Sequence, residues 1–167
     1  ALPICPNCGP TLYLYGSDKN EIASSKNGDI LKKTGSLLES GAIIAIKGVG
    51  GFHLVCDATN DKAVKGLRER KKRAKKPLAV MFGSIEEVKK ECLITPAEER
   101  LIGQIERPIT VVKKSNTFSL SGSISFESSF IGVFLSYSGV YEVLTREFLK
   151  PIVATSANIS DEPIITD

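Results

Sequence analysis

Short apolar runs alternate with amphipathic segments along most of the chain, and this alternation limits the possible folds more than any other feature. Apolar runs typical of buried strands lie at residues 42–47, 52–58, 78–82, 108–113, 130–135 and 152–155. Helical spacing and capping residues predict helices at 29–40, 60–72, 84–91, 95–102 and 140–148. Because the two patterns alternate, the predicted fold class is α/β. With 167 residues and 42% hydrophobic content, the chain is long enough for one domain with a proper core.

Two segments lack both periods and are expected to be loops. The first 20 residues are loop-like, and the serine-rich residues 115–129 are expected to form the most mobile internal segment. No apolar run approaches the roughly 18 residues of a membrane span, and the first residues do not resemble a signal peptide. The four cysteines do not form a disulfide pattern, so a reducing cytoplasm is the expected environment.

Six cations lie within seven residues at Arg70–Lys76, and the apolar run Pro77–Phe82 follows at once. Because the apolar run must be buried, the charges are held near a fixed surface, where they repel one another unless an anion is present. The net charge is only +3, so the cluster is a local feature and favours a binding site over a surface that coats nucleic acid. A solvated helix end, triphosphate recognition and contact with an RNA backbone all remain open.

Within this run, Lys71 continues the helical row that contains Ala63 and Leu67, so it is expected to point toward the apolar side. A lysine in that position needs a route to solvent or a partner. Lys76 precedes Pro77 and is expected to be extended, which begins the next strand.

Ser156 and Asn158 lie two residues apart where the last strand ends. Alternate residues of an extended chain face the same way, so both side chains are expected to project together, with the Thr155 hydroxyl next to them. Both can donate hydrogen bonds to phosphate oxygens. An ordinary Ser/Asn turn is the alternative. Together with the basic run, the motif favours a phosphate-binding site.

A glycine-rich turn, Gly48–Gly51, lies between two predicted strands. It is neither a Walker A loop nor a dinucleotide fingerprint, because no Lys-Ser/Thr pair and no helix follow it. Close approach of a ligand to Gly50 and Gly51 and a plain tight turn are equally compatible with it. Phe52 and His53 come next, and His53 is the only histidine of the chain. Its position next to the turn keeps it near any ligand bound there.

Cys5 and Cys8 have the spacing of half a tetrahedral zinc site. Cys56 and Cys92 lie in core-like segments and are not expected to supply the other half. We therefore expect no complete zinc site within this chain. Either the missing ligands precede Ala1 in a longer protein or the pair is incidental, and the first interpretation is favoured because the sequence starts without a methionine.

Five segments, in the order in which they occur, resemble the YrdC-like domain family: Lys47–Ala58, Leu67–Met81, Arg107–Val112, Ile131–Leu135 and Val153–Pro163. The likeness is greatest to the version within the HypF type of carbamoyltransferase, which matures nickel–iron hydrogenases. There, a zinc-finger segment that ends in CxxCGP precedes the domain, as Cys5–Pro10 does here. The resemblance implies that residues 1–20 are the end of a truncated zinc finger and linker, and that 21–167 form a YrdC-like nucleotide-binding domain of a larger protein.

The resemblance implies an open, twisted, mixed β-sheet with packed helices and a basic concave groove for ATP. The family's K-x-R motif falls on Lys71 and Arg73, its S-x-N motif on Ser156 and Asn158, and its strand threonine on Thr110. Lys76, Thr155 and residues 50–53 are expected to be further ligand contacts.

The implied reaction uses ATP and Mg2+, with Zn2+ bound only in the full-length protein. Carbamate, derived from carbamoyl phosphate elsewhere in that protein, attacks the α-phosphate, and pyrophosphate leaves. The carbamoyl group of the resulting carbamoyl-adenylate then passes toward a hydrogenase-maturation acceptor protein. Carbamate is already an anion, so the attack needs charge neutralisation and alignment and no general base.

Some positions depart from the family pattern. Asp161 follows Ser160 where the family has glycine, residues 136–142 lack the family's histidines, and Phe134 stands where the wider family often has arginine. YrdC-like domains are also described as binders of double-stranded RNA, so such a binding module is the alternative function. No base-stacking aromatics lie near the basic run, and RNA would be bound through shape and phosphates.

Overall fold

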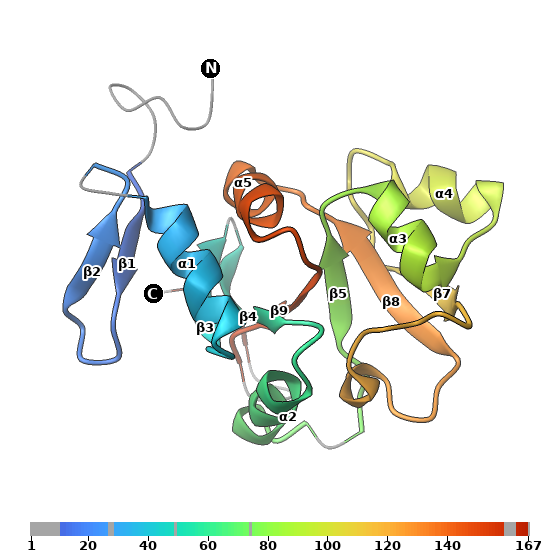
Figure 1. Cartoon of the computed structure of the whole chain (residues 1–167), viewed down its shortest axis with the longest axis horizontal. Coiled ribbons are helices and arrows are strands. Elements are labelled where there is room, and N and C mark those ends of the chain that lie inside the picture. Colours follow the sequence, from blue (N-terminus) through green and yellow to red (C-terminus); the bar gives the residue numbers. More distant parts are fainter. Residues whose placement is uncertain (1–10, 27–28, 49, 74, 159–162, 167) are drawn as a thin grey trace.

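The computed structural model describes residues 11–26, 29–48, 50–73, 75–158 and 163–166 (Figure 1). Its strands are β1 (Tyr13–Tyr15), β2 (Glu21–Ser24), β3 (Ile44–Gly48), β4 (Gly51–Asp57), β5 (Ala79–Phe82), β6 (Cys92–Leu93), β7 (Thr110–Lys114), β8 (Phe130–Leu135) and β9 (Ile152–Ser156). Its helices are α1 (Ile30–Glu39), α2 (Asp61–Arg70), α3 (Ile85–Glu91), α4 (Pro96–Ile102) and α5 (Gly139–Phe148), with a 3-10 turn η1 (Gly122–Ile124). Every strand and helix expected from the sequence is present within a few residues, which confirms the α/β class.

Seven strands form one mixed sheet in the order β3-β4-β9-β5-β8-β7-β6. The β5 and β8 strands are parallel, and the other neighbouring pairs are antiparallel. The strand β9, last in the chain, lies between β4 and β5 near the centre of the sheet. This insertion brings the end of β9, where Ser156 lies, next to the segment that leads from the basic run into β5.

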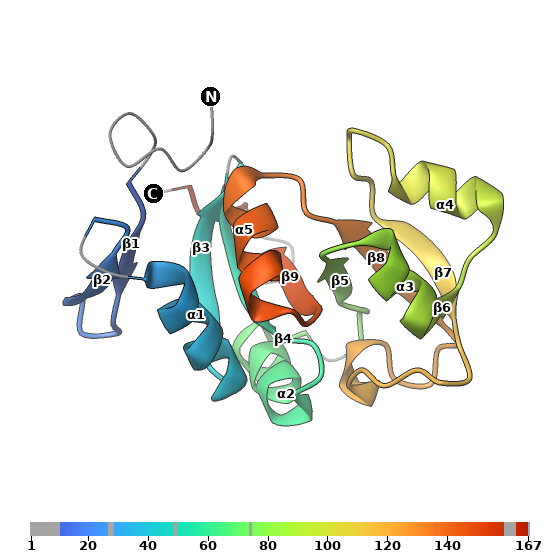
Figure 2. The ribbon, with the colours of Figure 1, turned by 45° about the horizontal axis from the view of Figure 1, so that its top comes forward.

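Helices cover both faces of the sheet, and each face has its own hydrophobic core (Figures 1 and 2). On one face, residues of α2, α3, α4 and η1 pack against alternate strand residues such as Val80 and Val133. On the other face, α1 and α5 lie side by side and pack against the intervening residues, including Met81 and Phe134. Because side chains alternate along a strand, the central strands β4, β9, β5 and β8 each supply both cores.

The hairpin of β1 and β2 shows that the sequence-based expectation for the first 20 residues is wrong in part. Tyr13 pairs with Ser24 and Leu14 with Ala23, so residues 13–15 form a strand and not a loop. Its three residues are too few to give a detectable period. The domain boundary expected between residues 20 and 21 lies at the end of the hairpin turn, which the hydrogen bond from Gly16 N–H to Asn20 O closes at 2.9 Å.

Residues 115–129 also differ from the expected flexible loop. Residues 120, 121 and 123–125 are buried, and Leu120 and Ile124 belong to the core under α2. The Ser121 and Ser123 hydroxyls donate hydrogen bonds of 2.6 and 2.7 Å to Asp61 Oδ1 at the start of α2. Serines that hydrogen-bond internally can be buried in spite of their polarity, which composition alone does not reveal.

Among the described helices, none combines the length and the apolar character that crossing a bilayer requires.

Candidate functional site: a cavity with a cationic end

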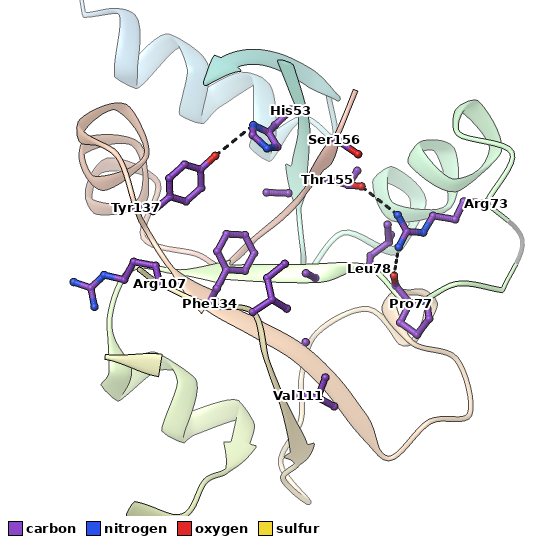
Figure 3. Close-up of a pocket in the computed structure, with 14 residues that line it drawn as sticks. His53, Arg73, Pro77, Leu78, Arg107, Val111, Phe134, Tyr137, Thr155 and Ser156 are labelled. Atoms are coloured by element: carbon purple, nitrogen blue, oxygen red, sulfur yellow. Dashed lines mark hydrogen bonds between the residues drawn. The ribbon is translucent and has the colours of Figure 1, made fainter. Parts of the chain in front are cut away.

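A cavity of about 580 Å³ opens on the sheet face that carries α1 and α5 (Figure 3). The volume lies within the roughly 300–1,000 Å³ of typical ligand pockets. Its floor is formed by a row of residues from four neighbouring strands, namely Ala154 of β9, Ala79 of β5, Gly132 of β8 and Val111 of β7. Gly132 is paired with both Ala79 and Val111, so these three positions lie side by side.

The cavity exists because three of the four floor residues are small. A Cβ atom added at Gly132 would lie 3.1 Å from Ile109 Cγ2 and 3.7 Å from Ala79 Cβ. Larger side chains at these positions would therefore fill the space above the sheet. Nothing in the local sequence marks Ala79, Gly132 and Ala154 as a set, since only strand pairing brings them together.

Arg73 lies at one end of the cavity and is held mainly by main-chain carbonyls (Figure 3). Its Nη2 donates to Pro77 O at 2.6 Å, its Nε to Lys76 O at 3.2 Å, and its Nη1 to Thr155 Oγ1 at 3.3 Å. These contacts fix the plane of the guanidinium, and no carboxylate of the described residues pairs with its charge. Arg73 and Thr155 thus meet as the sequence predicted, and both line the cavity together with Ser156.

The turn that follows α2 directs Arg73 toward the cavity. Arg73 N–H donates to Arg68 O at 3.0 Å and Lys72 N–H to Glu69 O at 3.0 Å, which is the pattern of a Schellman motif. Lys72 has the left-handed conformation this motif requires, with φ of 50°. The chain therefore reverses immediately after the helix, and the basic run folds back over the sheet instead of continuing into solvent.

Lys71 is buried, with 3% of its surface exposed, as its inward helical row predicted. Its ammonium donates to three oxygens, which are Ser156 O, Asn158 O at 2.7 Å and Asn158 Oδ1 at 3.3 Å. An ammonium group has three N–H donors, so these contacts use them all. Lys71 consequently lies behind the cavity wall, where it fixes the turn that carries Ser156 and Asn158.

Ser156 and Asn158 also contact each other directly. The Ser156 hydroxyl donates to Asn158 Oδ1 at 2.5 Å, so the two side chains project to one side as the spacing predicted. Ser156 lines the cavity, whereas Asn158 lies behind it with Lys71. The structure therefore gathers Lys71, Arg73, Ser156 and Asn158 at one end of one cavity, but it places only two of them on the cavity wall.

The cations at this end repel one another. Burial, and in second place the charge of Arg73, lowers the pKa of both Lys71 and Arg68 below their usual ranges. Within the described part of the chain, none of these three side chains forms an ion pair with a carboxylate. Their partners are neutral oxygens, so the site keeps a positive charge that a bound anion would neutralise.

The aromatic end of the cavity lies away from Arg73 and is lined by Phe134, Tyr137 and a second arginine, Arg107 (Figure 3). His53, whose strand position pairs with Ser156, lies between the two ends, and the Tyr137 hydroxyl lies 3.4 Å from its Nδ1. Behind them, Tyr141 of α5 is fully buried, and its ring lies edge-on to His53 and tilted against Tyr137. Burial lowers the pKa of His53 and raises that of Tyr137, so neutral forms are favoured at this end.

The remaining predicted contacts do not line the cavity. Gly50 and Gly51 form the β3–β4 turn, and Gly51, with φ of 127°, allows residues 164 and 165 to pass closely. Phe52 N–H donates to Ile165 O at 2.8 Å. The Lys76 side chain is exposed, and only its carbonyl takes part in the site.

Thr110 is buried, but its neighbours on either side, Ile109 and Val111, line the cavity. Its own side chain therefore faces the opposite side of the sheet, because side chains alternate along a strand. Arg107 lines the cavity and has φ of 49°, although it was not among the expected site residues. Its position directly before the strand of residues 108–113 was the available signal.

The described residues form no binding site for the metals that the resemblance implies. The cavity wall contains no carboxylate, and no group of three or more potential metal ligands occurs in the described ranges. Direct coordination of Mg2+ by these residues therefore does not fit. Cys5, Cys8 and Asp161 lie outside the described residues. Cys56 and Cys92 are buried in separate elements, and burial raises the pKa of both thiols to about 12.

Comparison with known proteins identifies the family. A family model named Sua5/YciO/YrdC and described as "Telomere recombination" matches residues 36–167. The carbamoyltransferase HypF of Synechocystis is 41% identical over 130 residues, which are 78% of this chain and 17% of that protein. The threonylcarbamoyl-AMP synthase of Bos taurus is 26% identical over 155 residues, 90% of this chain and 56% of that protein.

Two crystal structures of HypF proteins have the same fold. HypF of T. kodakarensis superimposes with a TM-score of 0.88 and 38% identity, over 98% of this chain and 21% of that one. A full-length HypF in a phosphate- and nucleotide-bound form gives 0.79 and 46%, over 82% of this chain and 22% of that one. The chain thus spans about a fifth of the length of the HypF proteins that it matches.

Proposed function

Because the chain belongs to the Sua5/YciO/YrdC family, we propose that it is the adenylate-forming domain of a carbamoyltransferase. In the proposed reaction, an oxygen of carbamate forms a bond to the α-phosphorus of ATP, and the bond from that phosphorus to the β-phosphate breaks. The products are carbamoyl-adenylate and pyrophosphate. The names of the relatives, carbamoyltransferase HypF and threonylcarbamoyl-AMP synthase, support chemistry of this type.

One observation carries the proposal within this molecule, namely the cationic end of the cavity. Arg68, Lys71 and Arg73 lie close enough for the charge of Arg73 to lower the pKa of the other two. They are held by carbonyl oxygens and not by carboxylates in the described residues. A charge arrangement that is destabilising without a ligand is suited to bind a polyanion such as a triphosphate.

The proposed roles of the residues follow from their positions. Arg73 lies on the cavity wall and would neutralise charge on the phosphates, while the Ser156 hydroxyl next to it would donate a hydrogen bond. Lys71 would act by holding the Ser156–Asn158 turn, and its charge would add to the potential. The rest of the nucleotide would extend over the small-residue floor toward the aromatic end.

Carbamate is an anion with free lone pairs, so its attack on phosphorus requires no general base. The residues supply what such a transfer needs, which is charge stabilisation and alignment. Magnesium, when bound to ATP, would neutralise part of the phosphate charge, and no described residue is assigned to it. The supply of carbamate from carbamoyl phosphate, the acceptor protein for hydrogenase maturation and a cytoplasmic location are proposals about the larger protein.

The test is isotope exchange between pyrophosphate and ATP, which occurs only if the adenylate forms reversibly. We expect exchange to depend on carbamate, supplied as a mixture of ammonium and bicarbonate, and to fail with either component alone. Calorimetry should show binding of ATP with magnesium. Binding of double-stranded RNA with steep salt dependence and no nucleotide selectivity, in the absence of exchange, would overturn the proposal in favour of an RNA-binding module.

A further inference from the structure

Arg68, in the last turn of α2, is buried with 6% of its surface exposed. Its guanidinium donates to four main-chain carbonyls, which are Ser123 O at 2.5 Å, Ile124 O at 2.8 Å, Arg73 O at 2.9 Å and Lys76 O at 3.2 Å. Two of these carbonyls belong to η1 and two to the loop that carries Arg73. One side chain thus joins two segments that are separated by about fifty residues in the sequence.

Besides these carbonyls, the guanidinium of Arg68 contacts an aromatic ring, and within the described residues it pairs with no carboxylate. The ring of Phe126 lies over the guanidinium, 4.4 Å from its carbon to the ring centroid, and covers one of its faces. Phe126 has φ of 42°, a conformation that residues other than glycine rarely adopt. The cation–π contact places the ring there and accounts for the tolerance of this backbone conformation.

The carbonyls that Arg68 holds also determine the position of Arg73. Lys76 O accepts from Arg68 Nη1 and from Arg73 Nε, both at 3.2 Å. Pro77 O, one residue further, accepts from Arg73 Nη2 at 2.6 Å. The loop is therefore held between two guanidinium groups, of which the buried one anchors it and the other faces the cavity.

We propose that Arg68 is a positioning residue for anion binding, because it fixes the carbonyls that hold the Arg73 guanidinium in place on the cavity wall. The inference rests on the proposed function, since it concerns the same phosphate-binding end. It adds that η1 and Phe126, outside the cavity, are part of the support of this site. Preorganisation of this kind matters because a misplacement of about 1 Å in a site can cost roughly a hundredfold in reaction rate.

The planar fork of arginine is necessary for this role. A guanidinium has five N–H donors in a fixed plane and reaches both segments at once, whereas an ammonium has three donors around one atom. Arg68→Lys therefore keeps the charge but loses the simultaneous contact with η1 and the loop. The substitution separates geometry from electrostatics.

The matched control is Asn60→Ala. Asn60 caps the start of the same helix, where its side chain accepts a hydrogen bond from Ala63 N–H at 3.1 Å, and it forms no hydrogen bond with η1 or with the described residues of the loop. The variant therefore weakens the helix without changing the contacts of Arg68 or Arg73. A second variant, Phe126→Leu, loosens the cover of Arg68 and keeps the arginine, so the proposal remains testable if Arg68→Lys fails to fold.

The experiment measures binding of pyrophosphate and of ATP by calorimetry, stability by thermal unfolding, and amide hydrogen exchange of residues 73–76. We expect Arg68→Lys to bind both ligands about tenfold more weakly, Phe126→Leu a few-fold more weakly, and both to exchange faster in the loop. Asn60→Ala should be destabilised and yet bind as the unaltered protein does.

Unchanged affinity in folded Arg68→Lys, or in folded Phe126→Leu where the lysine variant does not fold, would overturn the positioning role and leave the proposed function intact. Equal losses of affinity in Arg68→Lys and Asn60→Ala would also overturn it, because they would show a general effect of stability. If the unaltered protein bound neither ATP nor pyrophosphate, the proposed function would fail as well.

Discussion

At one end of the cavity Arg73 is held by main-chain carbonyls and a hydroxyl, whereas the other end carries the rings of Phe134 and Tyr137, with His53 beside them and Arg107 at the edge (Figure 3). The cationic end comes from a single loop after α2 and the end of β9. The aromatic end combines β4, β8 and the segment before α5. The cationic end can bind a negatively charged group of any ligand. The aromatic end, by contrast, favours ligands whose shape and rings fit its side chains. The comparison predicts that the two ends can be impaired separately.

The largest effect is expected for Arg73→Ala, which removes the cation on the cavity wall. Loss of a charge-assisted contact corresponds to about 1.5–3 kcal/mol, or roughly ten- to a hundredfold in the affinity for ATP. Calorimetry measures the affinity, and an unchanged melting curve shows that the fold is retained. Lys75→Ala is the control, because it removes an exposed cation of the same run. Equal losses in both variants would indicate diffuse electrostatics and remove the distinction between the ends.

Filling the floor between the two ends should have the next largest effect. A valine at position 132 would place methyl groups where Ile109 and Ala79 already limit the space. We expect Gly132→Val to weaken ATP binding about tenfold, or ~1.4 kcal/mol, while pyrophosphate binding at the cationic end changes little. Gly122→Val is a control in an open position. Unaltered ATP affinity in folded Gly132→Val would mean that the nucleotide does not cross the floor.

A smaller and more selective effect is expected at the aromatic end. Tyr137→Ala removes a ring that contacts His53, Phe134 and Tyr141. Aromatic contacts contribute about 0.5–1.5 kcal/mol each, so ATP affinity should fall roughly two- to tenfold. Pyrophosphate affinity should stay constant, because that ligand requires only the cationic end. Titration of both ligands against this variant checks the prediction, and a parallel loss of both would contradict it.

The smallest effect concerns pH, and it too belongs to the aromatic end. Burial lowers the pKa of His53 below its ordinary value of 6.5. Between the two values the unfolded chain binds more protons than the folded chain, so the free energy of unfolding falls as the pH drops through this window. Melting temperatures of the unaltered protein and of His53→Gln, compared at about pH 7.5 and about pH 5.5, should show a smaller decrease in the variant. Identical decreases would show that His53 does not contribute.

The cationic end could be anticipated from the sequence to a large extent. The basic run joined to a buried strand, the inward row of Lys71 and the alternation of Ser156 and Asn158 are local patterns. Local patterns survive folding because helix and strand geometry determines which residues share a face. The resemblance to the family added that the basic run and the turn with Ser156 and Asn158 belong to one site. It did not reveal that the donors of Lys71 are all used behind the cavity wall.

The aromatic end, the floor and the role of Arg68 could not be predicted in this way. Tyr137, Phe134 and His53 come from different elements, and Ala79, Gly132 and Ala154 form a floor only through the pairing of β8, β5 and β9. Thr110 was expected near the ligand and faces the other side of the sheet. These arrangements depend on strand order and register, which contacts between distant segments determine.

By itself the sequence determined the succession of strands and helices, the α/β class and the place of the positive charge, because periodicity and charge are properties of neighbouring residues. The tertiary structure alone decided where a cavity opens and which cations face it. Insertion of β9 between β4 and β5 brings Ser156 to the basic loop, and the carbonyls of η1 hold Arg68 beneath that loop. A hydrogen bond between such segments depends on the closure of the whole chain, so no local pattern encodes it.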